Sequence, residues 1–330
     1  MDWANIFTDA TVAAVGPVAA AYALSAIGLN LQFGYAGLLN FGHVAFMMAG
    51  AYGLAITVDA GGSFWLGLVV GVAAAMALGM LMGGPTLRLR ADYLAIVTIS
   101  AAEILRLLVR SSWAEPATNS VFGIQQFADP FFDLNPFDPT RRYAIGDFAF
   151  QGRVLWVMVV GWALVGAAVL LLHRLIRSPW GRMVRAVRED EDATAAVGKN
   201  TFFLKLQTLM IGGALAGIAG MILAVEKQSV SPDAFQPRLT FFLYVIVILG
   251  GAGTVWGPVF GAIVFQFLLF FFDGFMQSAE AEGWFGNAID ATDAQQFKLV
   301  LVGIGLMTLM ILRPQGFFGR RDEQLIGDTT

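Results

Sequence analysis

Polar side chains that fall within long apolar segments are the first candidates for chemistry in this sequence: Asn40, His43 and Glu103. Arg106 follows Glu103 by three residues, and residues at this spacing share one face of a helix, where opposite charges can pair. Polar and ionisable groups are costly in hydrocarbon, so they either satisfy one another or line a wet pathway. We expect Glu103 to form a structural ion pair or to line such a pathway. For Asn40 and His43 the corresponding alternatives are packing hydrogen bonds and pathway lining.

A dense group of charges occupies residues 173–205, between two apolar runs that are each long enough to cross a bilayer. Because charged side chains are costly in hydrocarbon, we expect this segment to lie in water at one face of a membrane. Ser178 followed by Pro179 is typical of a helix start, since serine caps free amides and proline suits the first helical position. Gly198 is typical of a helix end.

Inside this segment the pattern predicts a helix with one apolar face. Trp180, Val184 and Val187 recur at helical spacing, while the arginines among them fall on other faces. The acidic run at 189–192 either continues this helix or caps a second short helix over 193–197, since acidic side chains favour helix N-termini. We expect the segment to be either a docking site for another protein or a solvated loop whose charges only set the orientation of the chain.

Patterns of common catalytic and nucleotide-binding sites are missing. The sequence has no G-x-x-x-x-G-K-[ST] motif, and the glycine-rich stretch at 250–253 lacks the lysine of a phosphate loop. It has no H-E-x-x-H, no G-x-S-x-G and no carboxylate pair at catalytic spacing. Without cysteine, and with histidine only at His43 and His173, it offers no thiolate or histidine-rich metal centre. We therefore expect no enzyme, no cofactor or metal bound by this chain and, at a net charge of −4, no nucleic-acid binding.

The elements that must hold these residues are long apolar segments. Hydrophobic residues make up 57% of the 330 and charged residues only 13%, and the mean hydropathy is +0.69. Soluble domains carry about 25% charged residues, so this composition indicates a membrane protein. The predicted spans are 12–31, 39–58, 64–84, 93–109, 154–172, 206–225, one or two within 239–272, and 297–312. The predicted fold is an all-α, polytopic integral membrane protein with about eight or nine hydrophobic segments.

Two of these segments carry glycine in informative places. The region 239–272 is interrupted at 250–253 and by Pro258, so it predicts either two short spans or a re-entrant hairpin whose irregular backbone is buried. The segment 64–84 has a small residue at every fourth position, which lets helix backbones approach closely. We expect this stripe to serve packing within the bundle or to form a sliding interface.

Lysine and arginine are concentrated on alternate connections between the spans. The segment 173–205, the tail 313–330 and the turn at 88–90 are basic, which predicts a cytoplasmic location for all three. The loop 273–296 has acidic residues and no basic residue, so we expect it outside. The loop 111–152 also falls outside in this alternation and predicts a small external cap. The N-terminus lacks the features of a signal peptide, so we expect the first span to be retained.

Four stretches of the sequence together resemble the branched-chain amino acid ABC-transporter permeases. They are GYAGLLNFGHVAFMMAGAY at 34–52, LRADYLAIVTISAAE at 89–103, SPWGR at 178–182 with RAVREDED at 185–192, and RPQGFFG at 313–319. These stretches are distributed over nearly the whole chain, and their combination is specific. The long external loop and the ending are more similar to the LivM-type subunit of this family than to its LivH-type partner.

The resemblance implies an ABC importer permease, with residues 1–330 as a single transmembrane domain in the inner membrane of a bacterium or archaeon. The implied partners are a LivH-like second permease, two cytoplasmic ATPase subunits that use ATP and magnesium, and an external amino-acid-binding protein. The short helix after Asp190 would be the coupling helix that enters a cleft of an ATPase. The implied coupling residues are Arg185, Arg188, Glu189, Asp190, Glu191, Asp192, Ala193 and Gly198. Asp192 departs from the family, in which an apolar residue is common at its position.

Two other functions stay open from the sequence. The same kind of importer could carry urea or short amides, because no residue excludes them. A self-sufficient, ion-coupled secondary transporter would use intramembrane acids or an ion-coordinating helix break, for which Glu103 and 250–253 are the candidates. That function leaves the charged segment 173–205 unexplained, and uptake driven by ATP rather than by an ion gradient would exclude it.

Overall fold

The computed structural model describes residues 3–89, 91–139, 141–145 and 148–282, together with residues 300, 303–304, 307–308, 311 and 316–318. Helices make up most of the described chain, and only short two-stranded pairings accompany them, which confirms the predicted all-α class. The predicted span 297–312 and the tail 313–330 lie largely outside the described residues, and so does the loop 273–296 beyond residue 282.

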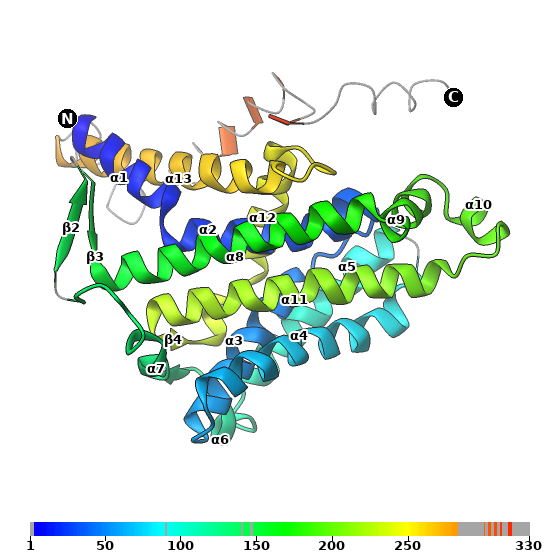
Figure 1. Cartoon of the computed structure of the whole chain (residues 1–330), viewed down its shortest axis with the longest axis horizontal. Helices are drawn as coiled ribbons and strands as arrows, with labels where there is room; N and C mark the ends of the chain where they lie inside the picture. Colours follow the sequence, from blue (N-terminus) through cyan, green and yellow to red (C-terminus); the bar gives the residue numbers. More distant parts are fainter. Residues whose placement is uncertain are drawn as a thin grey trace.

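Helices packed side by side form the body of the molecule (Figure 1). They are α1 (Trp3–Val15), α2 (Pro17–Asn30), α3 (His43–Asp59), α4 (Phe64–Thr86), α5 (Ala91–Arg110), α8 (Gly152–Arg177), α11 (Thr201–Lys227), α12 (Pro237–Gly250) and α13 (Gly257–Ala281). In the described chain, 5 helices are long and apolar enough to cross a membrane, or up to 6 spans if the bent pair at the N-terminal end counts as one. This agrees with the predicted polytopic membrane protein.

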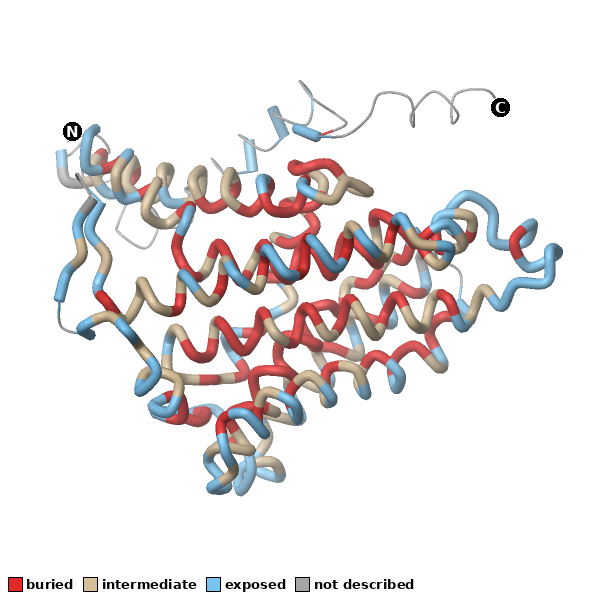
Figure 2. The backbone as a smooth tube through the Cα atoms, in the orientation of Figure 1, coloured by how far each residue is buried: buried red, intermediate tan, exposed pale blue. Residues whose placement is uncertain are grey.

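Helix α11 is the central helix of the bundle. It packs against α2, α3 and α4 and is largely buried, whereas α4 and α8 turn most of their apolar surface outward (Figure 2). The helices approach closely because glycine occupies the crossings. A Cβ atom at Gly220 would collide with the carbonyl of Met47, and one at Gly53 would lie 2.6 Å from the Cα of Gly71. The small-residue stripe predicted in 64–84 is buried along α4, as packing within the bundle requires, and a sliding interface stays a prediction.

Two predicted spans differ from the observed helices. The span predicted at 12–31 is bent by 45° between α1 and α2, because Pro17 begins the second helix and cannot continue the first. The span predicted at 39–58 was too long at its start. Helix α2 passes into the π-helical turn η1 (Leu31–Tyr35), residues 36–42 are not helical, and α3 begins only at His43.

Helices α12 and α13 form an antiparallel hairpin across the glycine-rich turn. A Cβ atom at Gly250 would collide with the backbone of Gly257, so the two helices touch at the turn. Further along, the rings of Phe242 and Phe265 pack with centroids 5.3 Å apart. Both arms are long and apolar enough to span, counting the short residues before α12. The hairpin therefore favours two spans over the re-entrant alternative.

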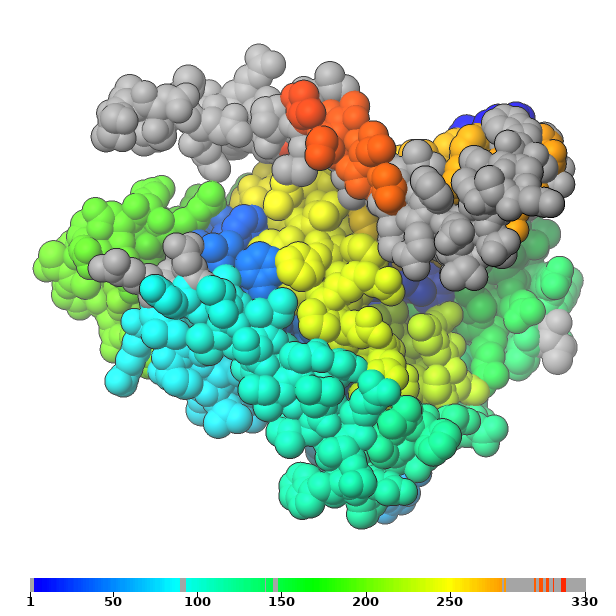
Figure 3. All heavy atoms as spheres, turned by 180° about the vertical axis from the view of Figure 1, so that it is seen from behind, coloured from blue at the N-terminus to red at the C-terminus, as the bar shows by residue number. Residues whose placement is uncertain are grey.

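Short elements gather at the two ends of the bundle. One end carries α6 (Glu115–Thr118), α7 (Asp129–Phe132) and two antiparallel pairings: β1 (Ile124–Gln125) with β4 (Ser229–Val230), and β2 (Arg142–Ile145) with β3 (Phe148–Gln151). The 3₁₀ turn η2 (Pro232–Ala234) lies beside them. The opposite end carries α9 (Pro179–Glu189) and α10 (Glu191–Ala196), which project beyond the long helices (Figure 1). Seen from behind, α5 and the following residues cover one side of α12 (Figure 3).

Candidate coupling segment and intramembrane polar network

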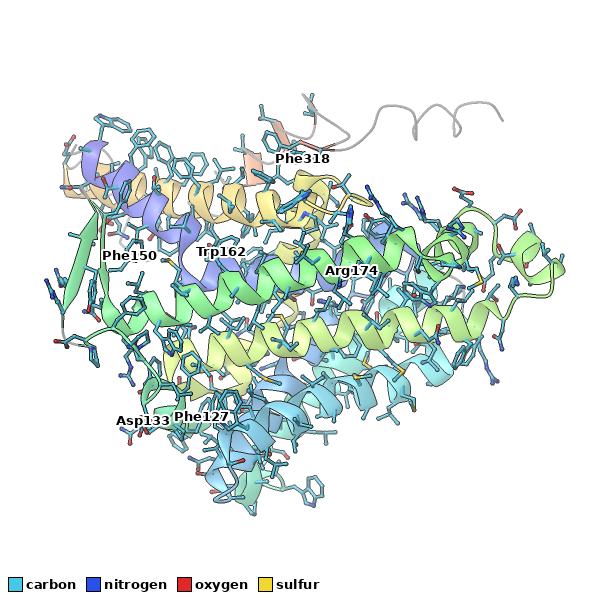
Figure 4. All side chains as sticks on the ribbon, viewed as in Figure 1. Phe127, Asp133, Phe150, Trp162, Arg174 and Phe318 are labelled. Carbon is cyan, nitrogen blue, oxygen red and sulfur yellow. The ribbon has the colours of Figure 1, made fainter. Side chains whose placement is uncertain are left out.

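Helix α9 is built as the sequence predicts. The hydroxyl of Ser178 accepts a hydrogen bond from the amide of Gly181 at 3.4 Å, and proline follows at the first helical position. Val184 and Val187 are buried, and Trp180 donates from Nε1 to Gln207 of α11 at 2.8 Å. The apolar face therefore docks α9 onto the bundle, next to the end of α8 marked by Arg174 in Figure 4.

The acidic run at 189–192 caps a second short helix, α10, and does not continue α9. Asp190 is its N-cap, and Oδ1 accepts from the amide of Ala193 at 2.8 Å. The helix stops before Gly198, whose φ of 79° is a left-handed conformation that favours glycine. Glu191 pairs with Lys205 of α11, which anchors the start of α10 to the bundle. The sequence-predicted residues of the segment thus lie together at one projecting end.

The outward face of this end is made of residues from α10 and from the ends that flank it. Glu189, Asp192 and Ala193 are exposed, and Val197 is 77% exposed although it is apolar. Sequence reasoning missed Val197 as a candidate contact, since a single valine before a glycine carries no distinctive pattern. Only the projecting fold makes it available to a partner.

The three arginines of α9 point back toward the chain itself. Arg182 and Arg185 donate to the carbonyls of Arg177 and Ile176, at 3.5 and 3.2 Å, which lie at the end of α8. Arg188 donates from Nη1 to the carbonyl of Gly34 in η1. Two residues that the sequence suggested as coupling residues, Arg185 and Arg188, therefore make contacts within this chain.

Asn40 and His43 lie in a buried hydrogen-bonded network around Gln32. Asn40 Nδ2 donates to Gln32 Oε1 at 3.0 Å, and His43 Nδ1 lies 3.3 Å from the same oxygen. His43 Nε2 lies 3.1 Å from the carbonyl of Ser25, so a neutral imidazole donates to one of these two acceptors. All three network side chains are buried within the chain. Their geometry fits packing hydrogen bonds, and a pathway role for them stays a prediction.

The non-helical backbone before α3 and the first turn of that helix are capped by side chains of α5, of α12 and of the segment itself. The amide of Phe41 donates to Thr98 Oγ1 of α5 at 3.1 Å, and the amide of Val44 donates to Thr240 Oγ1 of α12 at 3.1 Å. The amide of Gly42 donates to Asn40 Oδ1 at 3.0 Å. Irregular backbone at membrane depth requires such partners. Sequence reasoning missed Gln32, Thr98 and Thr240, whose signal was a polar residue inside an apolar run.

Glu103 pairs with Arg106 on α5, with a 2.6 Å contact. Arg106 also contacts Asp233 of η2 at 2.9 Å, and Arg110 reaches the same carboxylate at 3.3 Å. The cluster lies at the end of the bundle that carries α6 and α7, where Figure 4 marks Phe127 and Asp133. It ties α5 to η2, as a structural ion pair would, and a pathway role for Glu103 stays a prediction.

Metal chemistry finds no support in the part of the chain that the structure describes. There, no group of three or more His, Cys, Asp or Glu side chains comes together in a way that could hold a metal ion. Projecting helices held by caps, and a buried network of amides and hydroxyls, can dock and transmit movement.

The sequence of the chain is similar to those of known transport permeases. The sequence model of the family described as "Branched-chain amino acid transport system / permease component" matches residues 12–311. LivM of Escherichia coli strain K12, a high-affinity branched-chain amino acid transport system permease protein, is 33% identical over 315 residues, which cover 92% of this chain and 69% of LivM. The probable LivM of Methanocaldococcus jannaschii is 26% identical, over 74% of this chain and 76% of its own length.

LivH of Escherichia coli strain K12 is also a high-affinity branched-chain amino acid transport system permease protein. It is 26% identical over 322 residues, which cover 92% of this chain and 93% of LivH. Among solved structures, PsaBC from Streptococcus pneumoniae in complex with Fab aligns with 96% of this chain and 94% of its own, at 16% identity and a TM-score of 0.42.

Proposed function

The chain belongs to the family of branched-chain amino acid transport permeases and is of the LivM type, and from this membership we propose that it forms half of the translocation pathway of an ATP-driven importer of leucine, isoleucine and valine. A LivH-like permease supplies the other half. Two cytoplasmic ATPase subunits bind and hydrolyse ATP with magnesium, and an external amino-acid-binding protein delivers the substrate. The complex resides in the inner membrane of a bacterium or archaeon.

The observation that carries this proposal is the α9–α10 segment. It is a pair of capped helices that projects from one end of a polytopic bundle and is docked to that bundle by buried valines. The sequence has no phosphate-loop motif, so in an ATP-driven importer this chain must receive its driving force from an ATPase on another chain. A projecting element with an exposed face is a suitable receiver for that force.

Within this segment the proposed roles divide by the contacts that each residue makes within the chain. Glu189, Asp192, Ala193 and Val197 face the ATPase, since they are exposed at the projecting end. Asp190, Glu191 and Gly198 shape the segment through a cap, an ion pair and a left-handed stop. Closure of the ATPases on ATP would displace α9 and α10 and reorient the spans between outward and inward access. The segment 111–152, at the opposite end of the bundle, receives the loaded binding protein.

Uptake by the reconstituted complex tests the proposal. The chain is co-expressed with its permease, ATPase and binding-protein partners, purified by a tag on this chain and placed in liposomes. We expect concentrative uptake of leucine, isoleucine and valine that needs ATP on the side of α9 and α10. Uptake of urea or short amides in preference to these amino acids would overturn the substrate. Uptake driven by a proton or sodium gradient without ATP would overturn the mechanism.

A further inference from the structure

Two interruptions of the membrane helices meet near the α9 end of the bundle. Asn30, at the end of α2, donates from Nδ2 to the carbonyl of Thr254 at 2.8 Å, and its Oδ1 accepts from the amide of Gly253 at 2.8 Å. One side chain therefore joins the break after α2 to the turn between α12 and α13. Asn30 is buried, so these bonds are made away from bulk water.

The end of the described chain joins the same turn. The amides of Phe317 and Phe318 donate to the carbonyls of Leu249 and Gly250, at 2.9 and 3.1 Å. These are among the carbonyls that the end of a helix leaves without an intrahelical partner. The ring of Phe318 packs on Phe260 of α13 with centroids 4.6 Å apart (Figure 4). Phe317 and Phe318 are thereby part of the structure of the α12–α13 turn.

Arg188 reaches this meeting point from α9. Its Nη1 donates to the carbonyl of Gly34, and the same atom lies 3.3 Å from where a Cβ atom of Gly253 would be. Its Cγ lies 3.2 Å from where a Cβ atom of Gly37 would be. The guanidinium group therefore donates a hydrogen bond to the first interruption and lies close to the second. We call the set Asn30, Gly34, Gly37, Arg188, Gly253 and Thr254 the junction.

The other two arginines of α9 make a different kind of contact. Arg182 and Arg185 donate to carbonyls of α8, the helix that leads directly into α9, so they stabilise the local corner. Arg188 instead contacts Gly34, which lies 154 positions away in the π-helical turn that follows α2. A cavity of about 260 Å³ borders it, lined among others by Leu38, Leu87 and Leu94, so the guanidinium has room to exchange partners.

We propose that Arg188 is a positioning residue that passes the movement of α9 and α10 to the two interruptions of the membrane helices. Its side chain is exposed, and it acts through its hydrogen bond inside this chain rather than through a contact with the ATPase. The proposal rests on the proposed function, because it assumes that the ATPase moves this segment. A displaced α9 pulls on the carbonyl of Gly34, Asn30 passes the displacement to residues 253 and 254, and the α12–α13 hairpin turns about its glycine hinge.

The test compares matched arginine variants of the full reconstituted complex. Arg188→Gln removes the charge and the guanidinium, Arg188→Lys keeps a cationic donor, and Arg185→Gln is the control one helical turn earlier. For each variant we measure partner co-purification, ATP hydrolysis and the number of leucine molecules transported per ATP. We expect Arg188→Gln to keep its partners and most of its ATP hydrolysis while transport per ATP falls about tenfold. Arg188→Lys should recover part of the loss, and Arg185→Gln should change the ratio less than about twofold.

Other results would overturn the proposal. Loss of ATPase co-purification in Arg188→Gln would make Arg188 a partner contact, and an unchanged ratio would remove it from the transmission of force. If Arg188→Gln does not fold, hydrogen exchange in Arg188→Lys decides. With a non-hydrolysable ATP analogue, exchange in 34–42 and 250–256 should change less than in the wild type, while exchange in 179–197 responds normally. If the wild-type complex showed no ATP-dependent uptake, that result would instead contradict the proposed function.

Discussion

The core around α11 and the junction near α9 hold helices together by opposite means. In the core, α3, α4 and α11 meet backbone against backbone at Gly50, Gly71, Gly217 and Gly220, where a Cβ atom on any of them would overlap a neighbour. In the junction, regular α-helix ends, and backbone groups are satisfied by the side chains of Asn30 and Arg188. Close backbone packing holds the helices of the core together, whereas hydrogen bonds that can exchange partners hold the junction together.

This difference indicates which parts stay fixed and which parts move. Close backbone packing is satisfied in a single arrangement, since a shift along the helix brings larger residues to the crossing. Hydrogen bonds between a flexible side chain and a carbonyl break and reform for a small net change in free energy. We therefore expect α3, α4 and α11 to move as one body during transport, and the α12–α13 hairpin and η1 to move relative to it.

The largest expected effect comes from a substitution in the core. Gly220→Leu should destabilise the chain by about 3 kcal/mol, because the side chain must displace the backbone of Met47. Thermal unfolding and the yield of monodisperse protein measure this loss. Gly166→Leu on α8 is the matched control, since nothing lies within 4 Å of the position where its Cβ would be. Equal stability of the two variants would contradict the fixed core.

A smaller effect on stability is expected from the substitution of Asn30, a buried residue of the junction. Asn30→Leu leaves the carbonyl of Thr254 and the amide of Gly253 without their partner, which should cost about 2 kcal/mol. Because the junction also transmits movement, transport per ATP should fall further than the loss of folded protein explains. Uptake normalised to folded complex measures the two effects separately. A loss proportional to folding alone would reduce Asn30 to a structural residue.

A third substitution addresses the face that receives the force. Glu189→Lys combined with Asp190→Lys removes the N-cap of α10, for a local cost of about 1 kcal/mol, and reverses two charges at the exposed end. We expect normal membrane insertion, with ATP hydrolysis uncoupled from uptake. Protease accessibility checks insertion, and the two rates are measured on the same vesicles. Normal uptake would show that this face does not dock the ATPase.

Local features of the fold could be predicted from the sequence because their causes are local. Ser178 and Pro179 define the start of α9 by chemistry that involves only the next few residues, and Asp190 does the same for α10. The apolar periodicity of α9 also predicted its docked face, through Val184 and Val187. The small-residue stripe of α4 predicted close packing without naming the partner helix.

Long-range features could not be predicted in the same way. The span expected at 39–58 begins four residues later because its backbone is capped by Thr98 and Thr240, which lie far away in sequence. The contact of Arg188 within the chain could not be predicted, because a basic residue on a water-exposed helix gives no sign of its acceptor. The acceptor is the carbonyl of Gly34, and only the folded chain brings the two together.

The smallest expected effect sharpens the comparison at the opposite end. Glu103→Gln weakens the pair with Arg106, but Glu103 is 36% exposed, and Arg106 keeps its contact with Asp233. Partial exposure screens the charge, so the loss of stability should be about 0.5 kcal/mol. Transport per ATP should equal the wild-type value, because this cluster joins α5 to η2 and touches no residue of the junction. A clear fall in uptake without a loss of stability would place Glu103 in the pathway. Transport would then depend on residues at both ends of the bundle.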